Sequence, residues 1–264
     1  MVWRGLEKSK GVENRVLRNR AGVVTVSDYE KAVDNRTRII SVSHVSHRNG
    51  CVYDLKGLAD LAHAHGAYLH VDGIQALGAI DVNVKEAEVD FYTSGFYKWL
   101  LGRIGLAFLY VREELLSELE PVFRGFLQVK KWADDAHLLP QALYETARKF
   151  ETATIHFQGA FELKAALDYL NGVGMGKIEQ QVVRLSSRLW EGMGALDLRI
   201  FTPPEARSGI VTCLVDDGQA VRRLLDENGI VASVNMASEL RVSPHFFNVE
   251  EEIEYLLSVL QAGL

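Results

Sequence analysis

The chain has 264 residues, of which 48% are hydrophobic and 24% charged, and a formal net charge of −6. This composition is typical of a globular protein with a sizeable core, arranged as one large domain or two modest ones. It excludes a basic nucleic-acid groove, and the longest apolar stretches, such as residues 106–111, are far too short to cross a membrane.

The first half of the chain alternates between strand and helix patterns. Residues 38–45 form a buried strand pattern, 55–65 an amphipathic helix that stops at Gly66, and 67–71 a second strand. Two more apolar runs follow at 91–93 and 106–111. This βαβ order predicts a mostly parallel or mixed sheet that is covered by helices.

The second half begins with helical patterns and ends with a mixed segment. Helices are expected at 113–119, 141–150, 157–170 and 178–193. Strands are then expected at 210–215, 231–234 and 240–243, with helices at 220–228 and 250–260. We therefore expect a large domain at 1–152 and a small α+β domain at 153–264.

Polar side chains follow three of the expected strands at the point where each strand ends. His47 follows the first strand, Asp72 ends the second, and Lys98 comes shortly after the third. Ligands of open α/β sheets bind at these carboxyl ends, so the three side chains could face one crevice. A carboxylate that leaves a buried strand needs a cation or hydrogen-bond donors, and a protonated pyridine nitrogen is one such cation.

Lys98 lies among aromatic and aliphatic neighbours, which lower the pKa of a lysine toward the neutral amine that imine formation requires. Each residue alone also has a plainer interpretation. Asp72 would serve as a turn or helix-cap residue, and Lys98 would lie on the surface with a buried stem.

Three segments in order carry a family resemblance. Residues 69–76 read LHVDGIQA, residues 94–102 read SGFYKWLLG, and residues 240–248 read LRVSPHFFN. Together, at this spacing, they resemble the class V aminotransferases of pyridoxal phosphate (PLP) fold type I, a group with cysteine desulfurases, kynureninases and isopenicillin epimerase-like enzymes. The resemblance runs from about Val2 to the end. It implies an α/β large domain with a mostly parallel sheet, plus a small α+β C-terminal domain.

The resemblance also implies contacts to the cofactor. Asp72 would keep the ring nitrogen of PLP protonated, and Gln75 would hydrogen-bond the ring hydroxyl oxygen. Lys98 would be the Schiff-base lysine, whose freed amine then moves a proton at the substrate's α-carbon. Thr93 and Ser94 are the implied donors to the cofactor phosphate.

Four more residues match family positions. Tyr97 stands where the family usually has His, and it could also donate to the phosphate. His47 stands where many relatives have Asn near the ring, with a turn-capping loop histidine as the alternative. Arg241 matches the arginine that holds the substrate's α-carboxylate through two parallel hydrogen bonds. Thr154 resembles a threonine that reaches the phosphate of the neighbouring subunit, which implies a homodimer with the site at the interface, although Ala153 replaces the usual Gly.

Other motifs are interpreted as structural. The glycine-rich residues 172–177 lack the Ser or Thr of a phosphate loop, so we expect a helix-breaking linker. His63, His65 and His70 do not share one helix face and have no completing ligand, so we expect no metal site.

Two family features are absent from the sequence. Residues 231–239 lack the mobile cysteine of cysteine desulfurases, which argues against persulfide chemistry, because Cys213 falls inside an expected core strand. The family's N-terminal phosphate-binding helix is also missing, so the chain resembles a truncated member. Its loss should weaken cofactor binding.

The leading hypothesis is a PLP-dependent class V aminotransferase-type enzyme that acts on an amino acid. The alternatives are a PLP-dependent lyase, either a C–S lyase or a kynureninase-like enzyme, and a truncated homologue with impaired catalysis. We expect no nucleic-acid or membrane partner. The two cysteines lie far apart in the sequence, and the chain begins with a polar segment. Both features favour a cytoplasmic location.

Overall fold

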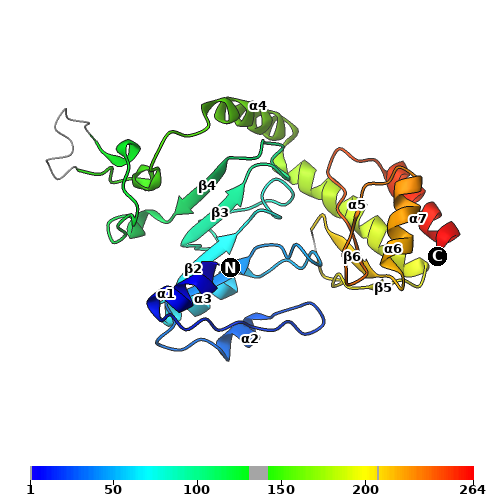
Figure 1. The fold of residues 1–264 in the computed structure, drawn as a ribbon, viewed down its shortest axis with the longest axis horizontal. Helices are drawn as coiled ribbons and strands as arrows, with labels where there is room; N and C mark the ends of the chain where they lie inside the picture. Colours follow the sequence, from blue (N-terminus) through cyan, green and yellow to red (C-terminus); the bar gives the residue numbers. More distant parts are fainter. Residues whose placement is uncertain (1, 131–141, 207) are drawn as a thin grey trace.

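The computed structural model describes residues 2–130, 142–206 and 208–264. Figure 1 shows two bodies side by side, each built around one four-stranded sheet, with helix α5 (Met175–Ala195) running from one to the other. In the described part of the chain, no helix is both long enough and apolar enough to cross a membrane.

The first sheet has the strand order β1-β2-β3-β4. β1 (Ile39–Ser43), β2 (Tyr68–Asp72) and β3 (Phe91–Gly95) are parallel, and β4 (Ala107–Val111) pairs antiparallel with β3. Helix α3 (Leu55–Ala64) makes the crossover between the first two strands. The α/β class with a mostly parallel sheet is therefore confirmed.

One face of this sheet is apolar because alternate strand residues point toward α3. Ile40, Leu69 and Tyr92 are at most 4% exposed and pack against Leu58 and Ala62 of the helix. Asp54 caps the helix by accepting a hydrogen bond from the Gly57 amide at 2.9 Å. The core thus fixes the direction in which each strand end points.

The N-terminal segment contains two helices that the sequence patterns did not predict. α1 (Val2–Lys10) places Trp3 edge-on against His70 of β2, with ring centroids 6.0 Å apart. α2 (Val26–Glu30) begins at Thr25 with a capping box. Both helices are shorter than the windows in which helical periodicity is reliable.

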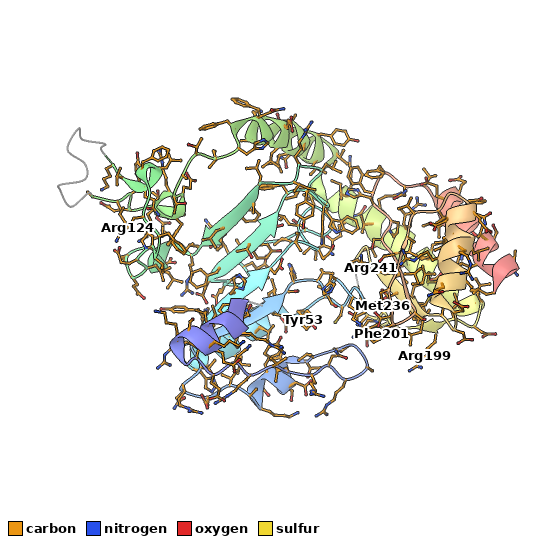
Figure 2. All side chains as sticks on the ribbon, viewed as in Figure 1. Tyr53, Arg124, Arg199, Phe201, Met236 and Arg241 are labelled. Carbon is orange, nitrogen blue, oxygen red and sulfur yellow. The ribbon has the colours of Figure 1, made fainter. Side chains whose placement is uncertain are left out.

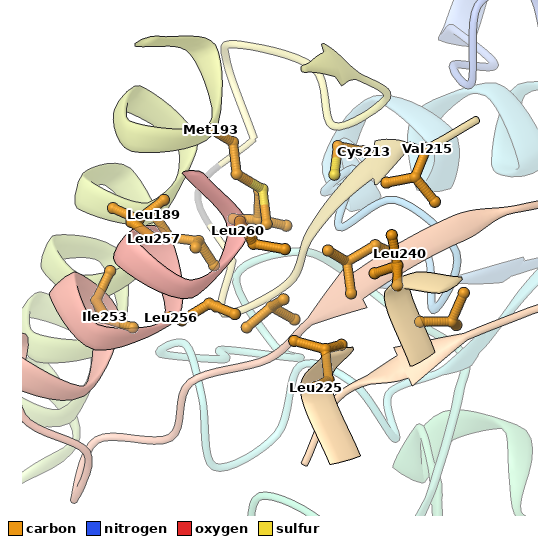
Figure 3. Packing of buried hydrophobic residues seen from close by; sticks show 14 of the residues in the cluster. Leu189, Met193, Cys213, Val215, Leu225, Leu240, Ile253, Leu256, Leu257 and Leu260 are labelled. Atoms are coloured by element: carbon orange, nitrogen blue, oxygen red, sulfur yellow. The ribbon is translucent and has the colours of Figure 1, made fainter. Parts of the chain in front are cut away.

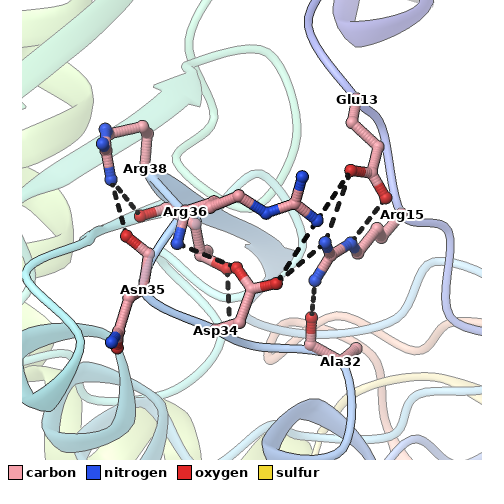
Figure 4. Close-up of polar contacts among 8 residues, drawn as sticks. Glu13, Arg15, Ala32, Asp34, Asn35, Arg36 and Arg38 are labelled. Atoms are coloured by element: carbon pink, nitrogen blue, oxygen red, sulfur yellow. Dashed lines mark hydrogen bonds and ion pairs between the residues drawn. The ribbon is translucent and has the colours of Figure 1, made fainter.

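Exposed charges tie the start of the chain to the segment before β1. Arg15 pairs with Glu13 at 2.8 Å and with Asp34 at 3.0 Å, and Arg36 lies beside the same two carboxylates (Figure 4). Solvent and salt screen pairs of this kind, so they orient the segment more than they stabilise the fold.

Two helix predictions were wrong in the segment between the sheets. Instead of a helix over 113–119, the structure has the short 3-10 turn η1 (Glu113–Leu115). Residues 142–150 hold only η3 (Ala147–Phe150), and Gln141 lies outside the described residues. A third turn, η2 (Phe126–Gln128), packs against η3. These segments lack a continuous apolar stripe facing a core, and helices of this length depend on such packing.

The predicted helices on either side of the glycine-rich segment are present. α4 (Phe157–Val173) ends and α5 begins at Gly174, which has φ 93° and could not hold an L side chain without strain. The glycine-rich segment therefore separates two helices, as the linker interpretation expected. α5 buries Ile178 and Val182 against the first body, and Leu185 and Leu189 against the second.

The second sheet has the order β5-β6-β8-β7 and is antiparallel throughout. Its strands are β5 (Arg199–Ile200), β6 (Val211–Leu214), β7 (Ser233–Val234) and β8 (Glu239–Val242). Helices α6 (Gly218–Glu227) and α7 (Glu250–Gly263) pack with α5 around it. Figure 3 shows the apolar core between these elements, which includes Met193, Cys213 and Leu240.

The buried carboxylate of Asp90 connects strand β2 with helix α3. Asp90 is fully buried and accepts hydrogen bonds from the Leu69 amide at 2.7 Å and from His63 at 2.9 Å. Arg112 pairs with its other oxygen at 2.9 Å. His63 therefore has a structural partner, as the sequence suggested for the histidines.

We expect Asp90→Asn to lower the free energy of unfolding by about 3–5 kcal/mol, because it leaves Arg112 without its buried partner. Chemical denaturation measures this. Asp168→Asn is the matched control, since Asp168 pairs with Lys164 on the surface of α4 at 2.5 Å. The control should change stability by less than about 0.5 kcal/mol, and equal losses in the two variants would contradict the prediction.

Candidate functional site

Three strand ends of the first sheet lie at the same edge. Ser43 of β1 is in register with Asp72 of β2, and Asp72 with Thr93 of β3. The loop after β1 carries His47, and the loop after β3 carries Lys98. The parallel sheet thus gathers the polar groups that the sequence placed at strand ends.

Asp72 ends the buried strand β2, and it is exposed to solvent. Its Oδ1 accepts a hydrogen bond from the Ile74 amide at 3.0 Å. This turn fixes the carboxylate as β2 ends. The other oxygen has no hydrogen bond among the described residues.

Lys98 lies among the charges of both bodies. Partial burial lowers its pKa, the positive charge of Arg241 lowers it further, and Asp72 acts in the opposite direction. His47 responds similarly, because burial, Arg241 and Lys98 lower its pKa while Asp72 raises it. Arg241 and Asp72 therefore act on both Lys98 and His47, and we call these four side chains the strand-end cluster.

Arg241 comes from the second sheet, and Figure 2 shows it on the side that faces the first body. Its Nη1 donates to the backbone carbonyl of His47 at 2.7 Å. The remaining guanidinium donors have no hydrogen-bond partner in the described chain. A planar guanidinium with free donors suits a carboxylate.

Gln75 is buried three residues after Asp72, and its orientation is set by a residue that the sequence analysis did not single out. The indole Nε1 of Trp99 donates to Gln75 Oε1 at 3.2 Å. The amide nitrogen of Gln75 therefore stays available as a donor. The signal was present in the sequence, because Trp99 directly follows the lysine.

Trp99 also ties the lysine loop to the second body. Its ring stacks on His245 with centroids 4.9 Å apart, and His245 stacks in turn on Phe247 at 4.4 Å. Burial lowers the pKa of His245 to about 4, so the ring is neutral at physiological pH. The loop that carries Lys98 is thus held by aromatic packing between the two bodies.

The residues expected at the phosphate side already have intramolecular partners. Ser94 donates to the Gly95 carbonyl at 2.9 Å, and Thr93 contacts His70 at 3.3 Å. His70 also contacts Ser41 at 2.9 Å on the same face of the sheet. Tyr97 is 45% exposed at the edge of this region.

Thr154 is exposed in the segment before α4. Within the described residues, no hydrogen bond links it to the strand-end cluster. The chain alone does not bring it to the other expected residues. Also in the described part of the chain, no group of three His, Cys, Asp or Glu side chains is arranged to hold a metal ion.

A hollow of about 650 Å³ opens on the His47 side of the strand-end cluster. Ser43, His47 and Arg48 line it from the first sheet, and Trp3 lines it from the N-terminal segment. Lys98 and Asp72 are not part of its lining. The cluster therefore sits at the rim of this hollow and not at its centre.

The sequence as a whole matches a known family. The aminotransferase class-V family model matches residues 1–256, and the chain belongs to this family. Class V enzymes use PLP, so the cofactor that the resemblance implied is that of the family.

Several individual proteins are similar to the chain. A probable cysteine desulfurase of Methanothermobacter thermautotrophicus is 30% identical over 274 residues, covering 96% of this chain and 68% of the relative. An uncharacterized aminotransferase of Bacillus subtilis, YcbU, is 29% identical and covers 91% of this chain and 64% of its own length. The chain thus spans about two thirds of the length of these relatives.

Solved structures agree on the fold. The apo structure of a cysteine desulfurase from Thermococcus onnurineus NA1 has a TM-score of 0.88 at 27% identity and covers 98% of this chain and 68% of that one. The cystine C-S lyase C-DES, in complex with its product cysteine persulfide, has a TM-score of 0.89 at 24% identity. The match covers 98% of this chain and 71% of that one.

The donor set fits PLP on the ring side. Asp72 offers a carboxylate, Gln75 a free amide donor, and Lys98 an amine with a lowered pKa. On the phosphate side, the Ser94 hydroxyl already donates within the chain, so this side offers fewer free donors.

Opposite charge changes should move the Lys98 pKa in opposite directions. Arg241→Gln removes a positive neighbour, so the pKa should rise and the amine should become reactive only at higher pH. Asp72→Asn removes a negative neighbour, so the pKa should fall and reactivity should extend to lower pH. Acylation of the cofactor-free protein across a pH series, followed by peptide mass spectrometry, measures the neutral fraction at Lys98.

The labelling profile of the exposed Lys85 serves as the internal control, because it should be the same in all three proteins. A shift of both variants in the same direction, or no shift in either, would show that the four side chains do not interact as described.

Proposed function

We propose that this chain is a PLP-dependent enzyme that acts on an amino acid, with Lys98 as the lysine that binds the cofactor. The observation that carries the proposal is the strand-end cluster, in which Arg241 lowers the pKa of Lys98 and Asp72 raises it. The family match supports it. The proposal applies to the chain as given, which spans about two thirds of the relatives' length.

Each residue has a distinct task. When bound, the cofactor supplies an electron sink for the electron pair of the bond that breaks at the α-carbon. Asp72 keeps the ring nitrogen protonated, and the Gln75 amide donates to the ring oxygen. Lys98 takes up and returns the proton at the α-carbon, because its lowered pKa suits a general acid/base.

Five more residues complete the proposed site around the phosphate, the ring and the substrate. Thr93, Ser94 and Tyr97 contact the phosphate side, which requires the serine to exchange its present bond to Gly95. His47 lies on the ring-hydroxyl side. Arg241 binds the α-carboxylate of the substrate with the donors that His47 does not use.

We further propose the organisation that the sequence suggested. The large domain comprises residues 1–152 and the small domain residues 153–264. The protein forms a homodimer, in which Thr154 serves the partner's site. We place it in the cytoplasm, since both of its cysteines are buried and unpaired.

A C–S lyase is the second candidate, because curated relatives are named cysteine desulfurases. A desulfurase needs a thiolate to accept sulfur. Burial raises the pKa of Cys51 and raises that of Cys213 to about 11, so neither thiol serves. Elimination from a sulfur-containing amino acid requires no protein thiol and remains open to this site. Release of sulfide and pyruvate from cysteine, or of cysteine persulfide and pyruvate from cystine, without a keto-acid acceptor would favour the lyase. Acceptor-dependent turnover would favour the transaminase.

Lys98→Ala should abolish the visible absorption band that the purified protein acquires with added PLP. Borohydride reduction and peptide mass spectrometry of the unsubstituted protein should then find the cofactor on the peptide that contains Lys98. Lys85→Ala is the matched control and should keep the band. A band that persists in Lys98→Ala, or none in the unsubstituted protein, would overturn the cofactor assignment and leave a catalytically impaired homologue.

Arg241→Gln should retain the PLP band but reduce kcat/KM by about 10- to 100-fold. This is the effect expected when a charged hydrogen-bond partner of a carboxylate is lost. Steady-state kinetics with the amino acid that supports turnover measures it. Unchanged kcat/KM would remove Arg241 from the substrate site.

A further inference from the structure

Side chains of the second body donate hydrogen bonds to three backbone carbonyls of the loop at residues 46–50. Arg241 donates to the His47 carbonyl at 2.7 Å, and Thr212 Oγ1 donates to the Arg48 carbonyl at 2.7 Å. Ser208 Oγ donates to the Gly50 carbonyl, also at 2.7 Å. We call residues 46–50 the clamped loop.

Gly50 shows how close the two bodies come. A Cβ at this position would lie 2.2 Å from the Ile210 carbonyl oxygen, and its φ of 72° also favours glycine. The clamped loop therefore cannot slide along the second sheet without breaking its hydrogen bonds.

One side-chain pair fixes the register of this contact. Arg48 Nε donates to both carboxylate oxygens of Glu239, at 2.9 and 3.0 Å, and Nη2 also contacts the carboxylate. The Glu239 side chain is only 4% exposed, and Asn235 donates to it at 2.7 Å. The Arg48 guanidinium lies 5.1 Å from the Phe201 ring centre.

The strand geometry connects this pair to the proposed substrate arginine. Glu239 and Arg241 are two residues apart on β8, so their side chains leave the same face of the sheet. Thr212 lies directly opposite Arg241 in register. These three side chains meet two adjacent residues of the clamped loop, His47 and Arg48.

An ion pair with a buried carboxylate such as Glu239 gives little net stability over apolar packing, because desolvation of the carboxylate cancels much of the attraction. The main effect of the Arg48–Glu239 pair is to fix the position of the loop. The contact of Arg48 with Glu239 fixes the loop, and the His47 carbonyl is thereby held where it accepts a hydrogen bond from Nη1 of Arg241. The remaining donors of the guanidinium have no hydrogen-bond partner in the described chain.

We propose that Arg48 and Glu239 form a positioning pair, which orients Arg241 through the clamped loop and thereby sets the affinity for the substrate carboxylate. Neither residue touches the substrate in this role. The inference rests on the proposed function, since it requires Arg241 to bind the carboxylate.

The test compares two amines that differ only in the carboxylate. Glycine and methylamine are titrated into the PLP-loaded full chain, and the change in visible absorption gives an apparent dissociation constant for each. The ratio of the two constants isolates the contribution of the carboxylate. Glu239→Gln and Arg48→Gln should each weaken glycine about tenfold relative to methylamine, a typical coupling between contacting residues.

Two comparisons separate positioning from a general structural effect. Glu254→Gln removes an equally bidentate partner of Arg188, at 2.6 and 2.8 Å, on the outside of the second body, and it should leave the ratio unchanged. In an Arg241→Gln background, Glu239→Gln should cause no further loss, because the residue through which it acts is gone.

A second measurement needs no cofactor and covers the case in which the buried Glu239→Gln variant folds poorly. Amide hydrogen exchange in residues 46–50 should be faster in Arg48→Gln, whose side chain is half exposed, while α5 and α7 exchange as before.

The outcomes are distinct. In one outcome, Arg241→Gln alone weakens the binding of glycine relative to methylamine, with no such effect in Arg48→Gln and Glu239→Gln. In that case the positioning proposal is wrong and the proposed function stands. A further loss from Glu239→Gln in the Arg241→Gln background would also overturn it. If the unsubstituted protein shows no Lys98-dependent band, the proposed function fails, and this inference fails with it.

Discussion

The contact between the clamped loop and β8 is the interaction on which the site depends. The first sheet supplies Asp72 and Lys98, but Arg241 belongs to the second sheet and reaches them only because the two bodies meet at this loop. Three of the bonds there run from side chains of the second body to backbone carbonyls of the loop, so their geometry is set by the fold of both bodies. A small rotation of one body would therefore separate the arginine from the lysine.

The lysine loop has its own connection between the bodies, which acts in parallel with the first. Trp99 stacks on His245 and packs so closely over Gly209 that a Cβ there would lie 2.3 Å from its ring. The same indole donates to Gln75. One side chain therefore links the orientation of the proposed ring contact, the path of the loop and the position of the second body. The geometry of the site therefore depends directly on how the two bodies pack.

The sequence predicted the parts of the structure that depend on local patterns. The parallel strands, the crossover helix and the strand-end positions of Asp72 and Lys98 follow from periodicity and from the rule for open sheets. It failed at 113–119 and 142–150, where the pattern suggested helices that no core supports. It also missed Trp99, Arg48 and Glu239, because their partners are 24 and 191 residues away and no periodicity reports such contacts.

The opposing charges around Lys98 also bear on the order of events in the proposed reaction. Without substrate, burial and Arg241 keep the pKa of Lys98 low, which favours the neutral form of its amine. A carboxylate held by Arg241 would cancel much of that positive charge, while Asp72 continues to raise the pKa. The amine would then become more basic when it is needed to take a proton from the α-carbon. A single arginine, fixed by the clamped loop, would thus couple substrate recognition to the basicity of the group that performs the chemistry.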